Sequence, residues 1–421
     1  MAENSPAQKL SHLQDAYLRI RNETSCLAEG LTDADATAQS MPDASPSKWH
    51  LAHTSWFFET FVLVPHIRNY TLFNPDYNFL FNSYYEAVGA RHPRPSRGLL
   101  TRPSLDDIKA YRNHVDEAVM AISGEAVSSQ ISTLLELGLH HEQQHQELFL
   151  TDILHLFAQN PLKPAYRNPV PLEVIREDGP PDIVWHQFAG GVVETGDRGD
   201  AFAFDCERPR HEALLRPFAL AGRAVTNGEW LTFMQDGGYA TASLWLADGW
   251  DAARNSNWSA PLYWHDADGQ WQQMTLRGLQ PVDLNAPVAH ISYYEADAFA
   301  TWFGARLPTE HEWEHASHSV ESDGNFADSE RYRPRPQTRQ GLAGMFGDVW
   351  EWTQSPFTPY PGFRVSGGAV GEYNGKFMSG QMVLRGGSCV TPQGHVRPTY
   401  RNFFHPDKRW QFSGLRLAKD C

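Results

Sequence analysis

Apolar residues recur at helical spacing in four stretches of the first 160 residues, and this pattern predicts four helices. These stretches are residues 8–31, 48–64, 104–122 and 134–157. Ser104 begins the third stretch and two aspartates follow it, an arrangement typical of a helix N-terminus. Four helices in this order predict an antiparallel bundle, a fold that builds metal sites from side chains on facing helices.

Residues 65–100 connect the second and third stretches and are predicted to form a loop rich in asparagine and aromatic residues. The loop ends with Arg91, Arg94 and Arg97. Because prolines separate them and disfavour a regular helix, we expect these arginines to project from an extended segment. Guanidinium groups bind carboxylates bidentately, so a carboxylate clamp is one interpretation and a solvated surface run is the other.

The pattern changes after residue 181 to short β-like runs separated by glycine, asparagine and aspartate. Helical periodicity remains only near residues 293–303 and 309–317. The whole chain is therefore predicted to have an α+β fold in two domains. The predicted parts are a four-helix bundle at residues 1–165, a Pro-rich linker at 166–181 and an irregular, loop-rich α+β domain at 182–421.

Composition narrows the classes of partner. The 421 residues carry a formal net charge of -15, which disfavours nucleic acid and anionic membrane surfaces. No apolar window of about 18 residues occurs, and residues 1–11 lack the apolar core of a signal peptide, so we expect a cytoplasmic protein. The four cysteines form no CxxC pair, so reduced thiols are expected. The sequence indicates no oligomeric state.

The fourth helical stretch contains the polar motif His141-Glu142-Gln-Gln-His145. Two imidazoles four residues apart share one helix face and can bind one divalent metal. The motif also matches the zinc peptidase signature, in which Glu142 would be the general base. One large class of such peptidases would need Gly and His where Leu148 and Thr151 stand. The third interpretation is a solvated polar helix face.

His50 and His53 lie in the second helical stretch among aromatic residues. A histidine in such a place is either a packed, hydrogen-bonded core residue or, if its helix faces His141 and His145, a metal ligand. Spacing alone leaves the third ligand and the metal unidentified.

A series of motifs in residues 182–421 resembles the formylglycine-generating-enzyme-like domain, an irregular C-type-lectin-like α+β fold. The motifs are Phe188-Ala-Gly-Gly, Glu207-Arg-Pro-Arg-His211, Val225-Thr-Asn-Gly-Glu229, Ser292-Tyr-Tyr-Glu-Ala296, Arg306-Leu-Pro-Thr-Glu310, Glu312-Trp-Glu314, Gly347-Asp-Val-Trp-Glu-Trp-Thr353 and Leu384-Arg-Gly-Gly-Ser388. The cysteine pair of active formylglycine-generating enzymes does not appear in that role, so that activity is not expected here.

The first domain resembles the DinB-like bundle, and the two domains in this order resemble the ergothioneine-type sulfoxide synthases, or hercynine oxygenases. The motifs Trp49-His-Leu-Ala-His53 and His141-Glu-Gln-Gln-His145 carry this resemblance. It implies a three-histidine non-haem iron(II) site, Fe(2+) bound by His53, His141 and His145, without His50. It also implies a dioxygen-dependent enzyme that joins the sulfur of cysteine to C2 of the imidazole of trimethylhistidine as a sulfoxide.

The same resemblance implies a set of substrate-binding residues. These are Arg94, Arg97, Gln144, Asn402, Phe403 and Phe404. Gln144 and Asn402 would hold trimethylhistidine, with nearby aromatic rings contacting its quaternary ammonium. Some relatives have Asp where this chain has Phe404, and that Asp helps to bind γ-glutamylcysteine. Phe404 cannot accept a hydrogen bond, which favours the cysteine-using subtype.

Tyr84 and Tyr85 are the candidate catalytic residues, as donors of a proton or an electron, and ordinary aromatic packing is the alternative. Arg94 and Arg97 match the arginines that bind the thiol substrate in this family. Rival hypotheses are a synthase that uses histidine itself, γ-glutamylcysteine or a selenium donor, a zinc peptidase, and a binding module without metal.

Overall fold

The computed structural model describes residues 6–123, 129–168, 182–337, 341–365, 367, 371 and 374–421. The chain divides into two compact units near Gln159, and each is described by itself. The greater part of the predicted linker, residues 169–181, lies outside the described residues. None of the described helices combines the length and the apolar character needed to cross a membrane. All four cysteines are free thiols, as predicted.

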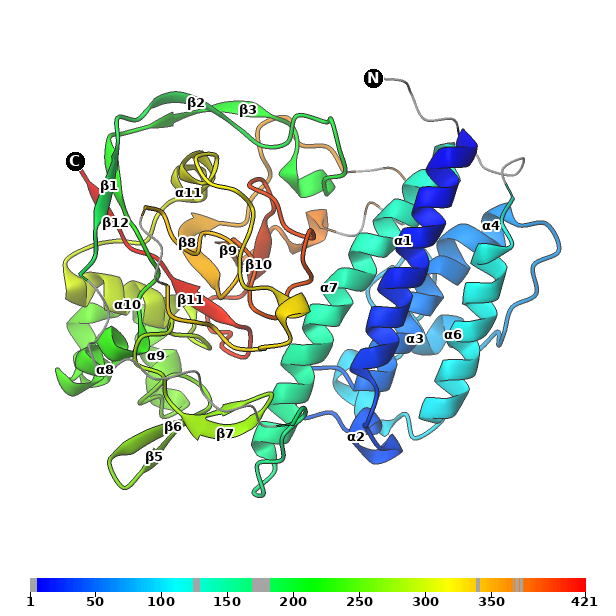
Figure 1. Ribbon diagram of the computed structural model, residues 1–421, viewed down its shortest axis with the longest axis horizontal. Helices are drawn as coiled ribbons and strands as arrows, with labels where there is room; N and C mark the ends of the chain where they lie inside the picture. Colours follow the sequence, from blue (N-terminus) through cyan, green and yellow to red (C-terminus); the bar gives the residue numbers. More distant parts are fainter. Residues whose placement is uncertain are drawn as a thin grey trace. The chain divides into compact units, whose positions relative to one another are not determined.

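The first unit is a bundle of four long helices (Figure 1). They are α1 (Pro6–Leu27), α3 (Ser47–Phe58), α6 (Leu105–Met120) and α7 (Ser129–Gln159), with the short α2 (Asp33–Thr37) between the first two. Helix α7 packs against α1 and α3, and α3 also packs against α6. The predicted N-cap is confirmed, since Ser104 Oγ accepts a hydrogen bond from the amide of Asp107.

The second predicted helix is confirmed through residue 64, but its last residues are not regular α-helix. After Phe58 the chain forms a π-helical turn, Glu59–Leu63, followed by the short α4 (Val64–His66). The buried Glu59 carboxylate accepts hydrogen bonds from Tyr70 Oη at 2.7 Å and Tyr111 Oη at 2.6 Å. These bonds fix the position of the turn, and one-turn π insertions of this kind are common beside functional sites.

The loop at residues 65–100 contains α5 (Tyr77–Phe81) and a 3-10 helix, Arg94–Leu99. The predicted extended segment is therefore wrong, because Arg94 and Arg97 lie on this helical turn. Pro95 is tolerated near the start of a helix, where its missing amide hydrogen would have no intrahelical acceptor. The prolines thus position the turn instead of preventing it.

A four-stranded sheet in the order β10-β9-β8-β11 lies at the centre of the second unit (Figure 1). Its strands are β8 (Trp350–Pro356), β9 (Met382–Arg385), β10 (Asn402–Phe404) and β11 (Ser413–Leu415), and only the β8/β11 pair is parallel. Three smaller sheets surround it. They contain β1 (Trp185–Phe188), β4 (Phe218–Ala221) and β12 (Ala418–Asp420); β2 (Gly191–Thr195) and β3 (His211–Leu215); and β5 (Trp264–Ala267), β6 (Gln270–Thr275) and β7 (Gly278–Pro281).

Four helices accompany these strands. They are α8 (Asn227–Gln235), α9 (Ala247–Asn255), α10 (Tyr293–Phe303) and α11 (Glu310–Ser317). The two helices expected in this region, α10 and α11, are confirmed, whereas α8 and α9 were not predicted. Helix α8 begins with a capping box between Thr226 and Glu229, so the four-residue pattern in Val225-Thr-Asn-Gly-Glu229 would have revealed it.

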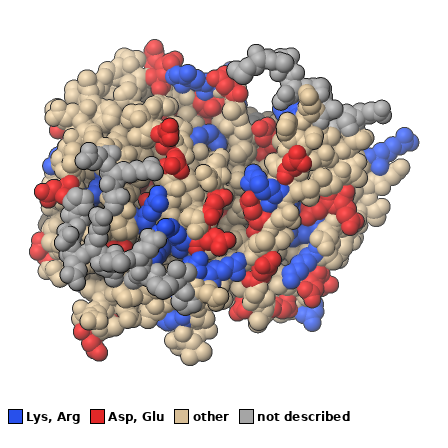
Figure 2. Space-filling view, viewed as in Figure 1, with Lys and Arg blue, Asp and Glu red and all other residues tan. Residues whose placement is uncertain are grey.

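Acidic and basic side chains are intermixed on the face seen in Figure 2, and the described residues of that face form no continuous basic patch. Inside the second unit, several buried charges form ion pairs. Arg416 binds Glu351 of β8 at 2.7 Å, and Arg385 and Arg401 both bind Glu310 of α11, at 2.9 Å and 2.8 Å. These pairs connect the central sheet to the segments around it.

Candidate metal centre

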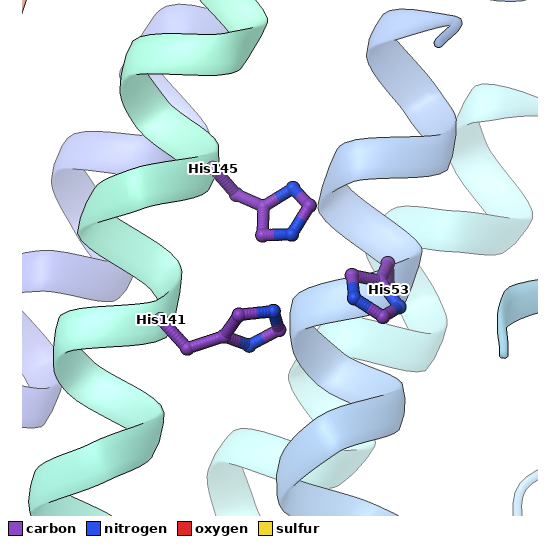
Figure 3. Close-up of side chains that lie close together, drawn as sticks. All are labelled: His53, His141 and His145. Carbon is purple, nitrogen blue, oxygen red and sulfur yellow. The ribbon is translucent and has the colours of Figure 1, made fainter. Parts of the chain in front are cut away.

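Three histidines of the first unit converge inside the bundle (Figure 3). His141 and His145 lie one turn apart on α7, and His53 faces them from α3. One nitrogen from each ring lies within 4.8 Å of the others. All three side chains are buried, so the cluster is enclosed by protein.

The orientation of His53 is fixed by the backbone. Its Nδ1 lies 2.6 Å from the carbonyl oxygen of Phe81, which can only accept, so Nδ1 carries the proton and Nε2 has the lone pair. Nε2 is buried and has no hydrogen-bond partner among the described residues. Leaving such an atom unsatisfied costs roughly 1–3 kcal/mol. A bound transition metal would satisfy it, so the residues present fit a metal ion.

Electrostatics keep the cluster in the form that binds metal. Burial lowers the pKa of His53, His141 and His145, and for His141 the pKa falls to about 3. The neighbouring histidines lower the pKa of His53 and His145 further, because two imidazolium charges would repel each other. The rings are therefore neutral at pH 7, as metal ligation requires.

Aromatic rings surround the cluster. Trp49 and Trp56 stack on His53 with centroid distances of 4.6 Å and 5.3 Å, and Phe57 lies 4.7 Å from His141. Tyr85 is fully buried, and its ring centroid lies 5.5 Å from that of Trp56. The ring of Tyr84 stacks on the ring of Tyr85 with a centroid distance of 4.7 Å. The aromatic shell excludes water and links the tyrosine pair to the histidines through Trp56.

Arg97 differs from the other buried arginines. Its guanidinium lies 3.4 Å from the centre of the Trp49 ring and donates to the hydroxyls of Ser45 at 2.9 Å and Ser83 at 3.3 Å. No carboxylate of the described residues forms an ion pair with it, although Asp152 is near enough to favour its charge. Burial, the largest effect, together with the neighbouring Arg94, lowers the pKa of Arg97 well below its usual value.

The remaining expected substrate residues are distributed over both units. Arg94 is exposed and donates to a backbone oxygen, that of Asp43, and Gln144 is half-buried on α7 between the two histidines of that helix. Asn402, Phe403 and Phe404 form β10 of the second unit. Phe403 stacks on Phe357 at 4.1 Å, and Phe404 meets Trp410 edge to face at 5.4 Å.

Glu142 is a buried ion-pair partner of two arginines, a role that its sequence motif did not indicate. Its two carboxylate oxygens accept hydrogen bonds from Arg21 and Arg112, each at 3.0 Å, and it is fully buried. Burial alone would raise the pKa of Glu142, but the two guanidinium groups hold it below its usual value. A carboxylate held in this way is not available as the base of a peptidase.

His50 was also left outside the predicted site, yet it touches one of the three clustered histidines. Its Nδ1 lies 2.9 Å from Nδ1 of His145, and its Nε2 lies 3.1 Å from Oδ2 of Asp152. Asp152 is seven residues after His145, two turns along the same face of α7. That spacing places both partners of His50 on one face of α7, but it does not identify His50 itself, which lies on α3.

Comparison with known proteins agrees with this architecture. The family model described as DinB superfamily matches residues 16–149, and the sulfatase-modifying factor enzyme 1-like domain matches residues 180–340 and 331–421. A hercynine oxygenase of Mycobacterium tuberculosis is 32% identical over 99% of this chain and 99% of its own length. One from Mycolicibacterium smegmatis is 30% identical, with 97% and 98% covered. A formylglycine-generating enzyme of Streptomyces coelicolor is 28% identical over 56% of this chain and 88% of its own length.

A DinB-like helical bundle that carries three clustered histidines, followed by a formylglycine-generating-enzyme-like α+β domain, defines an oxygenase with a candidate metal centre. The similarity extends over nearly the whole length of the chain and of its relatives. The chain belongs to the hercynine oxygenase family.

Proposed function

We propose that this chain is an iron(II)- and O2-dependent sulfoxide synthase of ergothioneine biosynthesis, which joins the sulfur of cysteine to C2 of the imidazole of N-α-trimethylhistidine (hercynine). The observation that carries the proposal is the buried cluster of His53, His141 and His145 in a chain similar to hercynine oxygenases along its full length. Three imidazoles on one face leave coordination positions for small ligands. Iron(II), when bound there, would supply the activation of dioxygen.

The thiol substrate would be held by its carboxylate. Arg97 offers a buried guanidinium whose polar partners among the described residues are two hydroxyls. A charge-assisted, bidentate bond to a carboxylate would supply the missing counter-charge. Arg94, on the same 3-10 turn, is exposed and would contribute at the rim. This geometry favours a small amino acid over a peptide chain.

Proton supply would come from the tyrosine pair. Tyr85 is fully buried beside Trp56, and Tyr84 stacks on it and is half-buried. A phenol in this shell can donate a proton while the aromatic walls exclude bulk water. We propose that one or both tyrosines protonate the reacting oxygen species.

From the family resemblance, Gln144 is proposed to hydrogen-bond trimethylhistidine. Asn402 and Phe403 are proposed as substrate-binding residues on the same ground, and nearby aromatic rings would offer cation–π attraction to the quaternary ammonium. Phe404 supplies no charge or acceptor for the amino group of γ-glutamylcysteine. We therefore propose that free cysteine is the preferred thiol.

The test is a matrix of substrates with anaerobically purified, iron-loaded protein. Trimethylhistidine or histidine is combined with cysteine, γ-glutamylcysteine or selenocysteine, and O2 uptake and product mass are recorded. Trimethylhistidine with cysteine should give the fastest turnover and a product with one new C–S bond and one sulfoxide oxygen. A clear preference for γ-glutamylcysteine would overturn the subtype, and no O2 uptake with any pair would overturn the function.

A further inference from the structure

His50 and Asp152 form a chain of hydrogen bonds behind the metal centre. Asp152 Oδ2 accepts from the amide of Ser45 at 2.8 Å and lies 3.1 Å from His50 Nε2. His50 Nδ1 lies 2.9 Å from His145 Nδ1. His50, Asp152 and His145 are all buried, so no bulk water competes for these contacts.

The chemistry of the three groups assigns every proton in this chain. A carboxylate only accepts, so His50 must carry a hydrogen on Nε2 in order to bond Asp152. A neutral imidazole with that hydrogen has a lone pair on Nδ1. His145 must then be the donor through its own Nδ1–H, because two facing lone pairs would repel. The lone pair of His145 consequently lies on Nε2.

We propose that Asp152 and His50 form a relay that holds His145 as the Nε2-binding tautomer, so that His50 is a positioning residue of the metal centre. The inference rests on the proposed function only in that His145 is taken as a metal ligand. His53 follows the same rule independently, since its Nδ1–H donates to the Phe81 carbonyl and leaves Nε2 as the lone-pair atom. Metal-binding histidines are commonly oriented in this way, and loss of the orienting partner typically weakens metal binding 10- to 100-fold.

The relay also reaches the proposed thiol-binding arginine. Ser45 donates its amide hydrogen to Asp152 and accepts a hydrogen bond on Oγ from Arg97 at 2.9 Å. One short segment before α3 therefore touches both the carboxylate of the relay and the guanidinium. A substitution of Asp152 is therefore expected to affect both the orientation of His145 and the position of Arg97. A substitution of His50 is expected to affect His145 alone.

The experiment measures Co(II) affinity of the full-length protein by competition with a chelator, together with the visible ligand-field spectrum of the Co(II) form. His50→Leu removes both ring hydrogen bonds and should weaken Co(II) binding about 10- to 100-fold and alter the spectrum. His50→Gln can still accept from His145 and donate to Asp152, so it should stay within a few-fold of wild type. His114→Leu, which changes a half-buried histidine of α6 bonded to the carbonyl oxygen of Thr71, is the control and should leave affinity unchanged.

The outcomes separate the two claims. Wild-type affinity and spectrum in His50→Leu would overturn the relay while leaving the metal centre intact. Tight Co(II) binding by His53→Ala, or none by wild type, would instead overturn the metal centre itself. If His50→Leu does not fold, as judged by circular dichroism, Asp152→Leu decides: it has no atom that can accept a hydrogen bond from His50, so unchanged Co(II) affinity there would overturn the relay.

Discussion

Two buried sites of this protein, one in each unit, satisfy their polar groups to different degrees. In the second unit, the buried guanidinium groups of Arg385 and Arg401 meet Glu310, and that of Arg416 meets Glu351. In the first unit, Nε2 of His53 is buried without a partner among the described residues. Because unsatisfied buried groups are costly, natural chains keep few of them, and each one calls for an explanation. The paired charges stabilise the fold, and the unpaired nitrogen of His53, which converges with nitrogens of His141 and His145, marks a position where a metal ion fits.

The same contrast exists within the bundle. Arg21 and Arg112 share the carboxylate of Glu142, whereas the partners of Arg97 in the described part of the chain are two hydroxyls and the face of Trp49. All of these arginines are buried, so exposure does not distinguish them. They differ in whether a carboxylate partner is present. An arginine with such a partner stabilises the fold, and one without it can bind a substrate carboxylate.

The largest expected effect follows from deleting a metal ligand. His53→Ala, His141→Ala and His145→Ala should each remove most bound iron and all turnover, because two imidazoles cannot complete the site. Iron content per protein and O2 uptake measure this. The control is His155→Ala, which leaves the cluster intact. Stoichiometric iron and normal turnover in His53→Ala would contradict the three-histidine assignment.

Removing the buried ion pairs of Glu142 should lower the stability of the protein and leave metal binding intact. Glu142→Gln leaves the buried guanidinium of Arg112 without a counter-charge and that of Arg21 with Asp116 alone, so the free energy of unfolding should fall by about 3–5 kcal/mol. Denaturant unfolding of the metal-free protein measures it. The fraction that remains folded should keep its iron and its O2 consumption, and wild type should hydrolyse no peptide. Intact stability together with lost turnover would restore Glu142 as a catalytic base.

Substitution of Arg97 should have the opposite effect, with little change in stability and a loss of substrate binding. Arg97→Met removes a buried charge that has no ion pair, so the free energy of unfolding should change by less than about 1 kcal/mol. Binding of cysteine, however, should weaken by roughly 2–5 kcal/mol, since the substrate carboxylate loses its partner. Steady-state kinetics with varied cysteine measures this, and Arg94→Ala should show a smaller effect because Arg94 is exposed. Unchanged apparent cysteine affinity in both variants would remove these arginines from the site.

Sequence patterns predicted the elements with strong local signals. Helical periodicity located the four bundle helices, and Ser104 was recognised as an N-cap because capping depends on neighbouring residues only. The π-helical turn after Phe58 was missed because the tertiary bonds of Glu59 to Tyr70 and Tyr111 hold it in place, and neither lies within a helical turn of Glu59. Helices α8 and α9 have 9 residues each, which is shorter than the window of about 11–18 residues in which helical periodicity is recognised, so only the capping signal at Thr226 marked one of them.

For the site, spacing predicted that His141 and His145 share a face, whereas His53 was chosen through a family resemblance. Its convergence with the other two depends on how α3 packs on α7, which no single-sequence pattern contains. The roles of Glu142 and His50 were missed for the same reason. Their partners, Arg21 and Asp152, lie more than a hundred residues away in the sequence.

The smallest expected effect is the pH dependence of the metal-free protein, and it compares a buried histidine of each unit. Burial lowers the pKa of His141 and of His290, each to about 3, while in the unfolded chain both titrate near pH 6.5. Between these values the unfolded state binds more protons, so the free energy of unfolding falls as pH falls, by up to about 1.4 kcal/mol per pH unit for each histidine.

His141→Gln and His290→Gln should each reduce the slope of the free energy of unfolding against pH between about pH 6 and pH 4, because each variant lacks one group that takes up a proton on unfolding. Denaturant unfolding at several pH values measures this slope. Added Co(II) distinguishes the two units, because a bound metal stabilises only the form in which its histidines are deprotonated. Co(II) should therefore raise stability near pH 7 in wild type and in His290→Gln but not in His141→Gln. An equal response of all three proteins to Co(II) would place the metal outside the histidine cluster and remove the distinction between the buried histidines of the two units.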